Sequence, residues 1–303
     1  MTSLTPCPSI LVPTRNEERN LPACLKSVAW CDDVVVFDSF SSDATVSLAE
    51  QQGARVVQRT FDNFASHKNW AISHVEFRHE WILILDADER ITPELAHEIQ
   101  ALLTSSPREN GFYVARQNWF AGHWIRHGGW YPNWNLRLFR RGKAQYEPRI
   151  VHEHMVVEGE AGFLKNPLVH YDYKGIERYI ERHNTYSSME AVEVFRTLHG
   201  KKESNTLKGL LWARGPERRR FLKNLAYRYL PARSFLKFLW MYIIQLGFLD
   251  GRAGFRYCLL HSIYEYQISL KLLELSDPKS AMTEKYSSYL GDSALAGRVM
   301  HGD

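Results

Sequence analysis

Residues 81–88 read WILILDAD, an apolar run that ends in two carboxylates, Asp86 and Asp88. A short, continuous apolar run of this kind is typical of a strand that is buried on both faces. Similar runs occur earlier in the chain, at 9–12, 34–37 and 55–58, and helical patterns lie between them at 16–30, 44–53 and 63–75. The alternation predicts an α/β fold, in which a mostly parallel sheet carries helices on both faces.

Polar side chains follow three of these predicted strands. Thr14 and Glu17 come after the first strand, Asp38 after the second, and Asp86 and Asp88 after the fourth. The carboxyl ends of parallel strands meet at one edge of the sheet, which is where such sheets bind ligands. We therefore expect these side chains to converge on one binding site.

The side chains at this edge suit a phosphate-bearing ligand. Two carboxylates at the spacing of Asp86 and Asp88 can hold a divalent cation against a diphosphate, although acidic residues also end strands for structural reasons alone. Asp38 can accept hydrogen bonds from a ribose or a base, or it can cap the helix that follows. Lys68 can face the base or the phosphates, or it can be a solvated lysine.

The charge is unevenly distributed, which argues against a nucleic-acid binder. The formal net charge is +4, yet residues 201–275 alone carry 14 Lys and Arg against 5 Asp and Glu, so the remainder is mildly acidic. The four cysteines have no metal-site or disulfide-framework spacing, which fits a reduced, cytoplasmic compartment. The longest uncharged apolar run, 238–249, is shorter than the roughly 20 residues of a spanning helix.

The basic segment is typical of a helix that lies in a membrane interface. Residues 217–230 place apolar side chains on one helical stripe and basic side chains beside it, and 234–249 is almost wholly apolar. We expect residues 201–275 to contact an anionic membrane surface, on the inner face of the cell membrane. The alternative is a helical subdomain that packs on itself or on a second subunit.

Four segments of the first half resemble family 2 glycosyltransferases of the GT-A fold: ILVPTRNEE (10–18), VVVFDSFSSDAT (34–45), HKNWAI (67–72) and LILDADE (83–89). The resemblance implies that Asp86 contacts the ribose or diphosphate of a nucleotide sugar and that Asp88 binds Mg²⁺ or Mn²⁺, with Asp86 beside it. It implies a nucleotide-sugar pocket lined by Pro13, Thr14, Glu17, Asp38, Lys68, Asp86, Ala87 and Asp88.

Three later segments narrow the resemblance: WYPNWNLRLFRR (130–141), RIVHEH (149–154) and PLVHYDYKGIERYIERHNTYSSMEA (167–191). They are similar to a branch that adds a β-linked glucose, or a similar sugar, to the lipopolysaccharide inner core or related surface glycans. The resemblance implies an inverting, metal-dependent hexosyltransferase, with a UDP-hexose donor, glucose first, and a saccharide or lipid-linked acceptor.

Inversion needs a base for the acceptor hydroxyl, and Glu153 is the candidate. A surface glutamate between two structural histidines is the alternative, and a metal pair of His152 and His154 is disfavoured because imidazole suits softer metals. Arg137 is the candidate for a diphosphate contact. On the acceptor side we expect Trp130, Trp134 and His152, since aromatic faces suit sugar rings as well as core packing.

The sequence predicts a catalytic domain at 1–175, with a nucleotide-binding half at 1–110 and an acceptor half at 111–175. A helical region at 176–277 and a poorly ordered tail at 278–303 follow. A sugar nucleotidyltransferase is the first alternative, but the PTRNEE turn at 13–18 lacks the glycines of a phosphate loop. A non-catalytic membrane adaptor with the same fold is the second. A dehydrogenase fits poorly because no GxGxxG follows the first strand.

Overall fold

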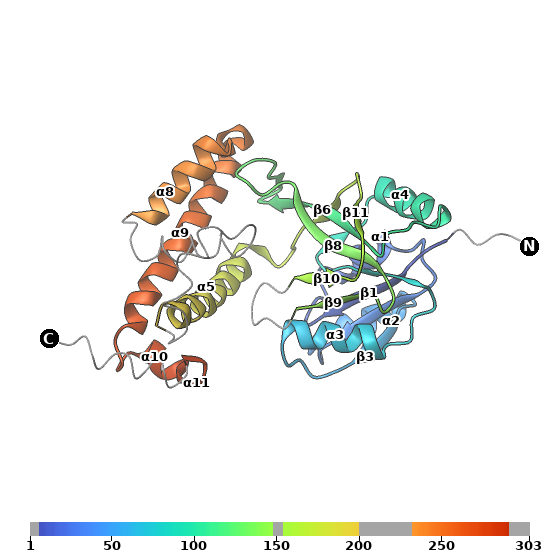
Figure 1. The fold of residues 1–303 in the computed structure, drawn as a ribbon, viewed down its shortest axis with the longest axis horizontal. Helices are drawn as coiled ribbons and strands as arrows, with labels where there is room; N and C mark the ends of the chain where they lie inside the picture. Colours follow the sequence, from blue (N-terminus) through green and yellow to red (C-terminus); the bar gives the residue numbers. More distant parts are fainter. Residues whose placement is uncertain (1–5, 148–153, 200–231, 291–303) are drawn as a thin grey trace, which may run out of the picture. The chain divides into compact units, whose positions relative to one another are not determined.

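The structure is a computed structural model that describes residues 6–147, 154–199 and 232–290. The chain divides into two compact units, Met1–Gly175 and Ile176–Asp303 (Figure 1). The first unit holds the sheet, and the regular elements in the described part of the second unit are helices.

The sheet of the first unit begins with four parallel strands, which confirms the α/β prediction for this half. Their order in space is β3 (Arg55–Gln58), β2 (Val34–Asp38), β1 (Ser9–Thr14) and β4 (Trp81–Ile84). The sheet then becomes mixed. It continues through β8 (Asn133–Arg140), β6 (Gly111–Phe120), β12 (Leu168–His170) and β5 (Glu89–Arg90), and only the β6–β12 pair in this part is parallel.

Helices cover both faces of the parallel half, as the sequence predicts. Side chains of α1 (Leu21–Ser27), α2 (Thr45–Gln51) and α4 (Pro93–Thr104) join one apolar core, and those of α3 (Phe64–His74) join the core on the other face (Figure 1). Helix α4 begins as expected, because the Thr92 hydroxyl accepts a hydrogen bond from the Leu95 amide at 3.1 Å and Pro93 follows the cap.

The predicted helix at 16–30 is wrong at its start. Helix α1 begins only at Leu21, since Asn16 has a left-handed backbone (φ 55°) and residues 15–20 form a loop. Shorter strands complete the unit: β7 (His123–Trp124) and β11 (Ala161–Phe163) pair with β6, and β9 (Ala144–Tyr146) pairs with β10 (Met155–Val157). Residues 148–153 lie outside the described part of the chain, so only His154 of the segment RIVHEH (149–154) is described.

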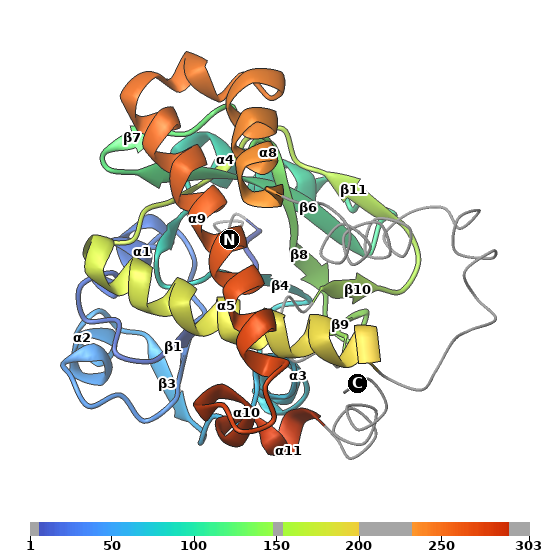
Figure 2. The same ribbon diagram turned by 90° about the vertical axis from the view of Figure 1, so that its left-hand side faces the viewer.

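The second unit is built from helices. They are α5 (Gly175–His199), which starts at the last residue of the first unit, α8 (Arg233–Leu239), η1 (Trp240–Ile244), η2 (Gly247–Asp250), α9 (Gly251–Leu275), α10 (Ala281–Lys285) and α11 (Ser287–Leu290). Figure 2 shows α9 crossing α5, and apolar side chains of both helices share one core with α10 and α11. Within the described residues, no helix has both the length and the apolar character needed to cross a bilayer.

The prediction of a poorly ordered tail at 278–303 is wrong for its first part. Helix α10 (Ala281–Lys285) is capped by Ser280, whose hydroxyl accepts a hydrogen bond from the Thr283 amide at 3.1 Å. Met282 and Leu290 are then buried against α5 and α9. Burial of these two apolar side chains stabilises the segment, although its composition did not suggest an ordered structure. Residues 291–303 lie outside the described part of the chain.

Candidate functional site

The loops after β1 and β2 are hydrogen-bonded to each other, which holds the carboxyl ends of these two strands together. The Ser42 amide donates to Asn16 Oδ1 at 2.8 Å, and the Asn16 amide donates to Ser41 Oγ at 2.8 Å. The Glu17 amide donates to Thr45 Oγ1 at 2.7 Å. These contacts explain the left-handed turn at Asn16, since an asparagine tolerates that conformation and bonds to nearby backbone.

Asp38 ends β2 and orders this edge from within. Its carboxylate accepts hydrogen bonds from the Thr14 hydroxyl at 3.0 Å, from the Ser41 amide at 2.8 Å and hydroxyl at 2.5 Å, and from Gln58 Nε2 at 3.1 Å. The side chain is fully buried. None of these contacts caps α2 (Thr45–Gln51), whose N-cap is Ala44 without a side-chain cap, so the capping alternative is wrong. A nucleotide contact from Asp38 remains a prediction.

Asp86 is held by an arginine from a distant strand. Arg137 Nη2 on β8 lies 2.7 Å from Asp86 Oδ2 and 2.5 Å from Glu89 Oε1, and Arg116 Nη1 lies 3.6 Å from the same Glu89 oxygen. Burial would raise the pKa of Asp86, but the positive charges of Arg137 and Lys68 outweigh it and hold that pKa below its ordinary value. Asp86 is therefore ionised and fixed in position.

The contacts of Arg137 differ from its predicted diphosphate contact. Its side chain is 6% exposed, and it forms ion pairs with the Asp86 and Glu89 carboxylates rather than facing the open edge. Burial raises the pKa of Glu89 above its ordinary value, while Arg137 opposes that rise. We therefore treat Arg137 as a positioning residue for the acidic loop, because a guanidinium fork can bond two carboxylates at once.

Asp88 lies beside a histidine that the sequence did not single out. His170 Nε2, at the end of β12, is 3.2 Å from Asp88 Oδ2, and both side chains are 17% exposed. The Tyr171 amide donates to the Asp88 carbonyl at 2.9 Å, which fixes the two segments together. Asn118 pairs with His170 in the β6–β12 register, and its buried Oδ1 has no hydrogen-bond partner within the described residues.

The segment after His170 is tied to the loop after β1. Lys174 Nζ lies 2.6 Å from Glu17 Oε1, and Asn20 Nδ2 donates to both Glu17 Oε2 and Asp172 Oδ1 at 3.0 Å. Burial raises the pKa of Glu17, with Lys174 opposing and the charge of Asp88 adding to the rise. The polar ends of β1, β4 and β12 thus meet at one edge, as the sequence predicts for the first two.

The remaining predicted residues surround this edge to different degrees. Lys68 Nζ, on α3, lies 4.9 Å from the centre of the Tyr146 ring, and its charge acts on Asp86. Pro13 is half-buried in β1, and Ala87 is buried within the acidic loop. Trp130 is half-buried and Trp134 is exposed, the latter edge-on to Phe163. Glu153 and His152 lie outside the described residues.

The donor atoms around Asp88 fit a divalent cation. The Asp88 carboxylate oxygen and the His170 ring nitrogen lie side by side. Asn118, whose buried Oδ1 has no hydrogen-bond partner within the described residues, is the residue of β6 that pairs with His170. Two protein ligands of this kind leave positions for diphosphate oxygens and water, which is how Mg²⁺ is commonly held. The carboxylate and the remaining oxygen ligands suit Mg²⁺ or Mn²⁺, and the single imidazole adds one nitrogen ligand.

Comparison with known proteins agrees with these motifs. The model of the family described as Glycosyl transferase family 2 matches residues 9–168. A lipopolysaccharide core biosynthesis glycosyltransferase, LpsC of Rhizobium meliloti, is 31% identical over 183 residues, which are 58% of this chain and 67% of that protein. An uncharacterized glycosyltransferase of Rickettsia felis is 29% identical over 214 residues, which are 65% of this chain and 72% of that protein.

Solved structures resemble only part of the chain. A glucosyl-3-phosphoglycerate synthase from Mycobacterium tuberculosis, crystallised with Mn²⁺, UDP-glucose and phosphoglyceric acid, is 19% identical with a TM-score of 0.32. The match covers 36% of this chain and 43% of that one. S. aureus TarS matches 83% of this chain and 54% of its own, with 16% identity and a TM-score of 0.41.

Proposed function

The chain belongs to glycosyl transferase family 2, and from this premise we propose that it transfers a hexose from a nucleotide-diphosphate sugar to an acceptor of a bacterial surface glycan. The observation that carries the proposal is the position of Asp88 and His170, side by side at the edge where the strand ends meet. The similarity to a lipopolysaccharide core enzyme supports a saccharide or lipid-linked acceptor. UDP-glucose is the first donor to test.

In this proposal a divalent cation, Mn²⁺ or Mg²⁺, is held by Asp88 and His170 and supplies positive charge to the departing diphosphate. The protein orients that site through its own contacts. Arg137 fixes the Asp86 carboxylate through one oxygen, and the Glu17–Lys174 pair joins the segment after His170 to the loop after β1. Lys68 places a second positive charge near Asp86.

The reaction is proposed to invert the anomeric centre, with Glu153 as the base that takes the acceptor proton. This requires the base to lie on the side of the sugar opposite the leaving diphosphate. Trp130 and Trp134 are the proposed acceptor-side aromatics, and Trp134 offers an exposed face for a sugar ring. Nucleotide sugars are cytoplasmic metabolites, so we propose that the protein lies on the inner face of the cell membrane.

A panel of nucleotide sugars, incubated with Mn²⁺ and with saccharide acceptors, tests the activity. We expect release of the nucleoside diphosphate with the wild type and at least about a 100-fold lower rate with Asp88→Asn or His170→Gln. His97→Gln, an exposed histidine on α4, is the matched control and keeps the wild-type rate. Equal rates in all four proteins contradict the proposal.

Two other outcomes separate the alternatives. Transfer of a nucleotidyl group without sugar transfer identifies a sugar nucleotidyltransferase. No affinity for any nucleotide identifies a non-catalytic adaptor. Because the site residues are the same in each case, these functions are distinguished by the affinity for nucleotides and by the chemical identity of the product.

We also propose that the second unit contacts an anionic membrane surface. Large apolar side chains are exposed along α8, η1 and η2. A contiguous exposed apolar surface of this kind is rare in soluble proteins and marks interaction sites. They are Phe235, Leu236, Trp240, Ile243, Ile244, Leu246, Phe248 and Leu249. One basic side chain, Lys237, lies on α8 beside them, whereas Arg233 on the same helix is 12% exposed and ion-paired with Glu265. Residues 200–231, which hold the basic stripe predicted at 217–230, lie outside the described residues.

A further inference from the structure

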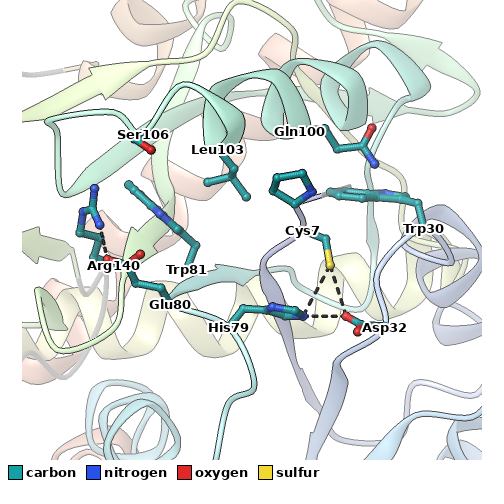
Figure 3. Close-up of a pocket in the computed structure, with 11 residues that line it drawn as sticks. Cys7, Trp30, Asp32, His79, Glu80, Trp81, Gln100, Leu103, Ser106 and Arg140 are labelled. Carbon is teal, nitrogen blue, oxygen red and sulfur yellow. Dashed lines mark hydrogen bonds and ion pairs between the residues drawn. The ribbon is translucent and has the colours of Figure 1, made fainter. Parts of the chain in front are cut away.

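Three metal-ligating side chains converge at the opposite end of the parallel strands. Cys7 precedes β1, Asp32 precedes β2 and His79 precedes β4, and these strands are neighbours in the order β2, β1, β4. Figure 3 shows the three side chains pointing toward one another. Their ligand atoms all lie within 4.8 Å of one another. The active-site carboxylates lie after the same strands, so this cluster is separate from them.

The three atoms surround one point. Cys7 Sγ lies 3.3 Å from Asp32 Oδ1 and 3.5 Å from His79 Nε2, and His79 Nε2 lies 2.6 Å from the same aspartate oxygen. A nucleophilic Cys–His–Asp arrangement needs the thiol on one ring nitrogen and the carboxylate on the other. Here both contact Nε2. The geometry therefore excludes a catalytic Cys–His–Asp arrangement and favours one ion bound by all three side chains.

The spacing is close to that of a tetrahedral zinc site. A zinc ion with bonds of about 2.0 to 2.3 Å holds its ligand atoms about 3.3 to 3.6 Å apart. Both distances from the Cys7 sulfur fall in or near that range, and only the hydrogen-bonded His79–Asp32 contact must open. The Asp32 side chain is 54% exposed, so it can make this small movement.

We propose that Cys7, Asp32 and His79 form a binding site for Zn²⁺ that joins the amino ends of three neighbouring strands. A thiolate, an imidazole and a carboxylate are the ligands that zinc takes in proteins, and the thiolate disfavours Mg²⁺ and Ca²⁺. Three protein ligands leave the fourth position to water.

The surroundings support the site. The backbone of the ligands is held in place, since the His79 amide donates to Ser9 Oγ at 3.1 Å and Arg78 Nη1 donates to the Asp32 carbonyl at 3.0 Å. Metal binding at this site releases the thiol proton of Cys7, because the thiolate is the form of cysteine that binds zinc.

The cluster lines a cavity of about 590 Å³. Trp30, Trp81 and Leu103 give the cavity apolar walls, and Gln100 and Arg140 add polar groups (Figure 3). The cavity is large enough for water to reach a metal ion held by the three ligands. The zinc site is thus accessible from solvent rather than closed within the core.

The full chain, purified without metal under a phosphine reductant, tests the proposal. Titration with Co²⁺ as a spectroscopic substitute is expected to give one equivalent of tetrahedral metal with a sulfur-to-cobalt charge-transfer band, and Zn²⁺ is expected to displace it. Cys7→Ser should abolish the band. His79→Gln and Asp32→Asn should each weaken Zn²⁺ binding at least about tenfold.

Cys31→Ser is the matched control, because it changes the neighbouring thiol without removing a proposed ligand. It should retain the band and bind Zn²⁺ within about tenfold of the wild type. Absence of a sulfur band in the wild type, or a band that persists in Cys7→Ser, overturns the site. So does a loss in Cys31→Ser equal to that in Cys7→Ser. The band needs a thiolate, so it does not report on metal bound at Asp88 and His170.

Discussion

Arg137 and Glu89 form a buried ion pair, with Nη2 2.5 Å from Oε1, directly behind the loop that carries Asp86 and Asp88. The same guanidinium bonds Asp86 at 2.7 Å. The pair therefore joins β8 to the acidic loop and β5. The orientation of the loop carboxylates depends on a residue that lies about fifty positions later in the chain.

Replacing Arg137 with methionine should destabilise the protein by about 3 to 5 kcal/mol, because it leaves the buried Glu89 carboxylate without its nearest charge. Urea unfolding measures the loss. The double variant Arg137→Met/Glu89→Gln should recover part of it, since the uncompensated charge is gone. Arg178→Met on α5 removes an ion pair with Glu181 in which both side chains are 58% exposed, and it should cost about 1 kcal/mol or less. Equal losses at the two arginines would refute the buried-pair account.

Removing apolar surface from η1 should weaken membrane binding. Trp240 and Ile244 are more than half exposed, and replacing both with serine should lower co-sedimentation with phosphatidylserine vesicles at least about tenfold. The control is Tyr289→Ser on α11. Tyr289 is as exposed to solvent as Trp240, and this variant should bind vesicles as the wild type does. Unchanged co-sedimentation of the double variant would count against the membrane surface and in favour of a packing role.

His261 should make the second unit sensitive to acid. Burial, with the nearby charges of Lys237 and His183, lowers the pKa of His261 from 6.5 to about 3. Between these values the unfolded chain binds a proton that the folded chain does not. Stability therefore falls as the pH falls, by up to about 1.4 kcal/mol per pH unit.

His261→Gln should remove this dependence. Urea unfolding between pH 7.5 and 4.5 should show a flatter decline for the variant than for the wild type. His97→Gln, an exposed histidine, should keep the wild-type slope. Parallel curves for the wild type and His261→Gln would show that the buried imidazole does not titrate as proposed.

Gly254 allows η2 to pack on α9. A Cβ atom there would lie 2.0 Å from the Gly247 carbonyl oxygen and 2.8 Å from Asp250 Cβ. Alanine normally stabilises a helix interior by about 1 kcal/mol relative to glycine, but this clash should outweigh the gain and cost about 1 to 3 kcal/mol. Arg252→Ala, exposed on the same helix, is the control for thermal unfolding. A variant Gly254→Ala as stable as the wild type would contradict the close packing.

The hydrophobic pattern and the polar strand ends predicted the first half of the fold, because each of its first four strands is a short apolar run. Leu21 and Leu25 are buried within α1, yet Glu17 and Glu18, which the predicted helix at 16–30 includes, lie in a loop. That difference follows from side-chain bonds between two loops, such as Asn16 with Ser42, which no local pattern encodes.

The part of the site that the sequence missed depends on a long-range strand pair. His170 reaches Asp88 because β12 pairs with β5, two strands of three and two residues. Strands this short carry little periodicity. One signal in the sequence could have identified His170. It follows the short apolar stretch 168–169, just as Asp38 and Asp86 follow apolar stretches. Arg137 was found, but its buried contacts could not be derived from an alternating strand pattern alone.

We propose that Asp88 and His170 hold a cation that binds the diphosphate of the donor. Calorimetric titration of UDP with and without Mn²⁺, in the wild type and in Asp88→Asn, tests this role. Mn²⁺ should raise the UDP affinity of the wild type by about tenfold or more and leave that of the variant unchanged. Equal UDP affinity with and without metal in the wild type, or a full metal effect in Asp88→Asn, would contradict it.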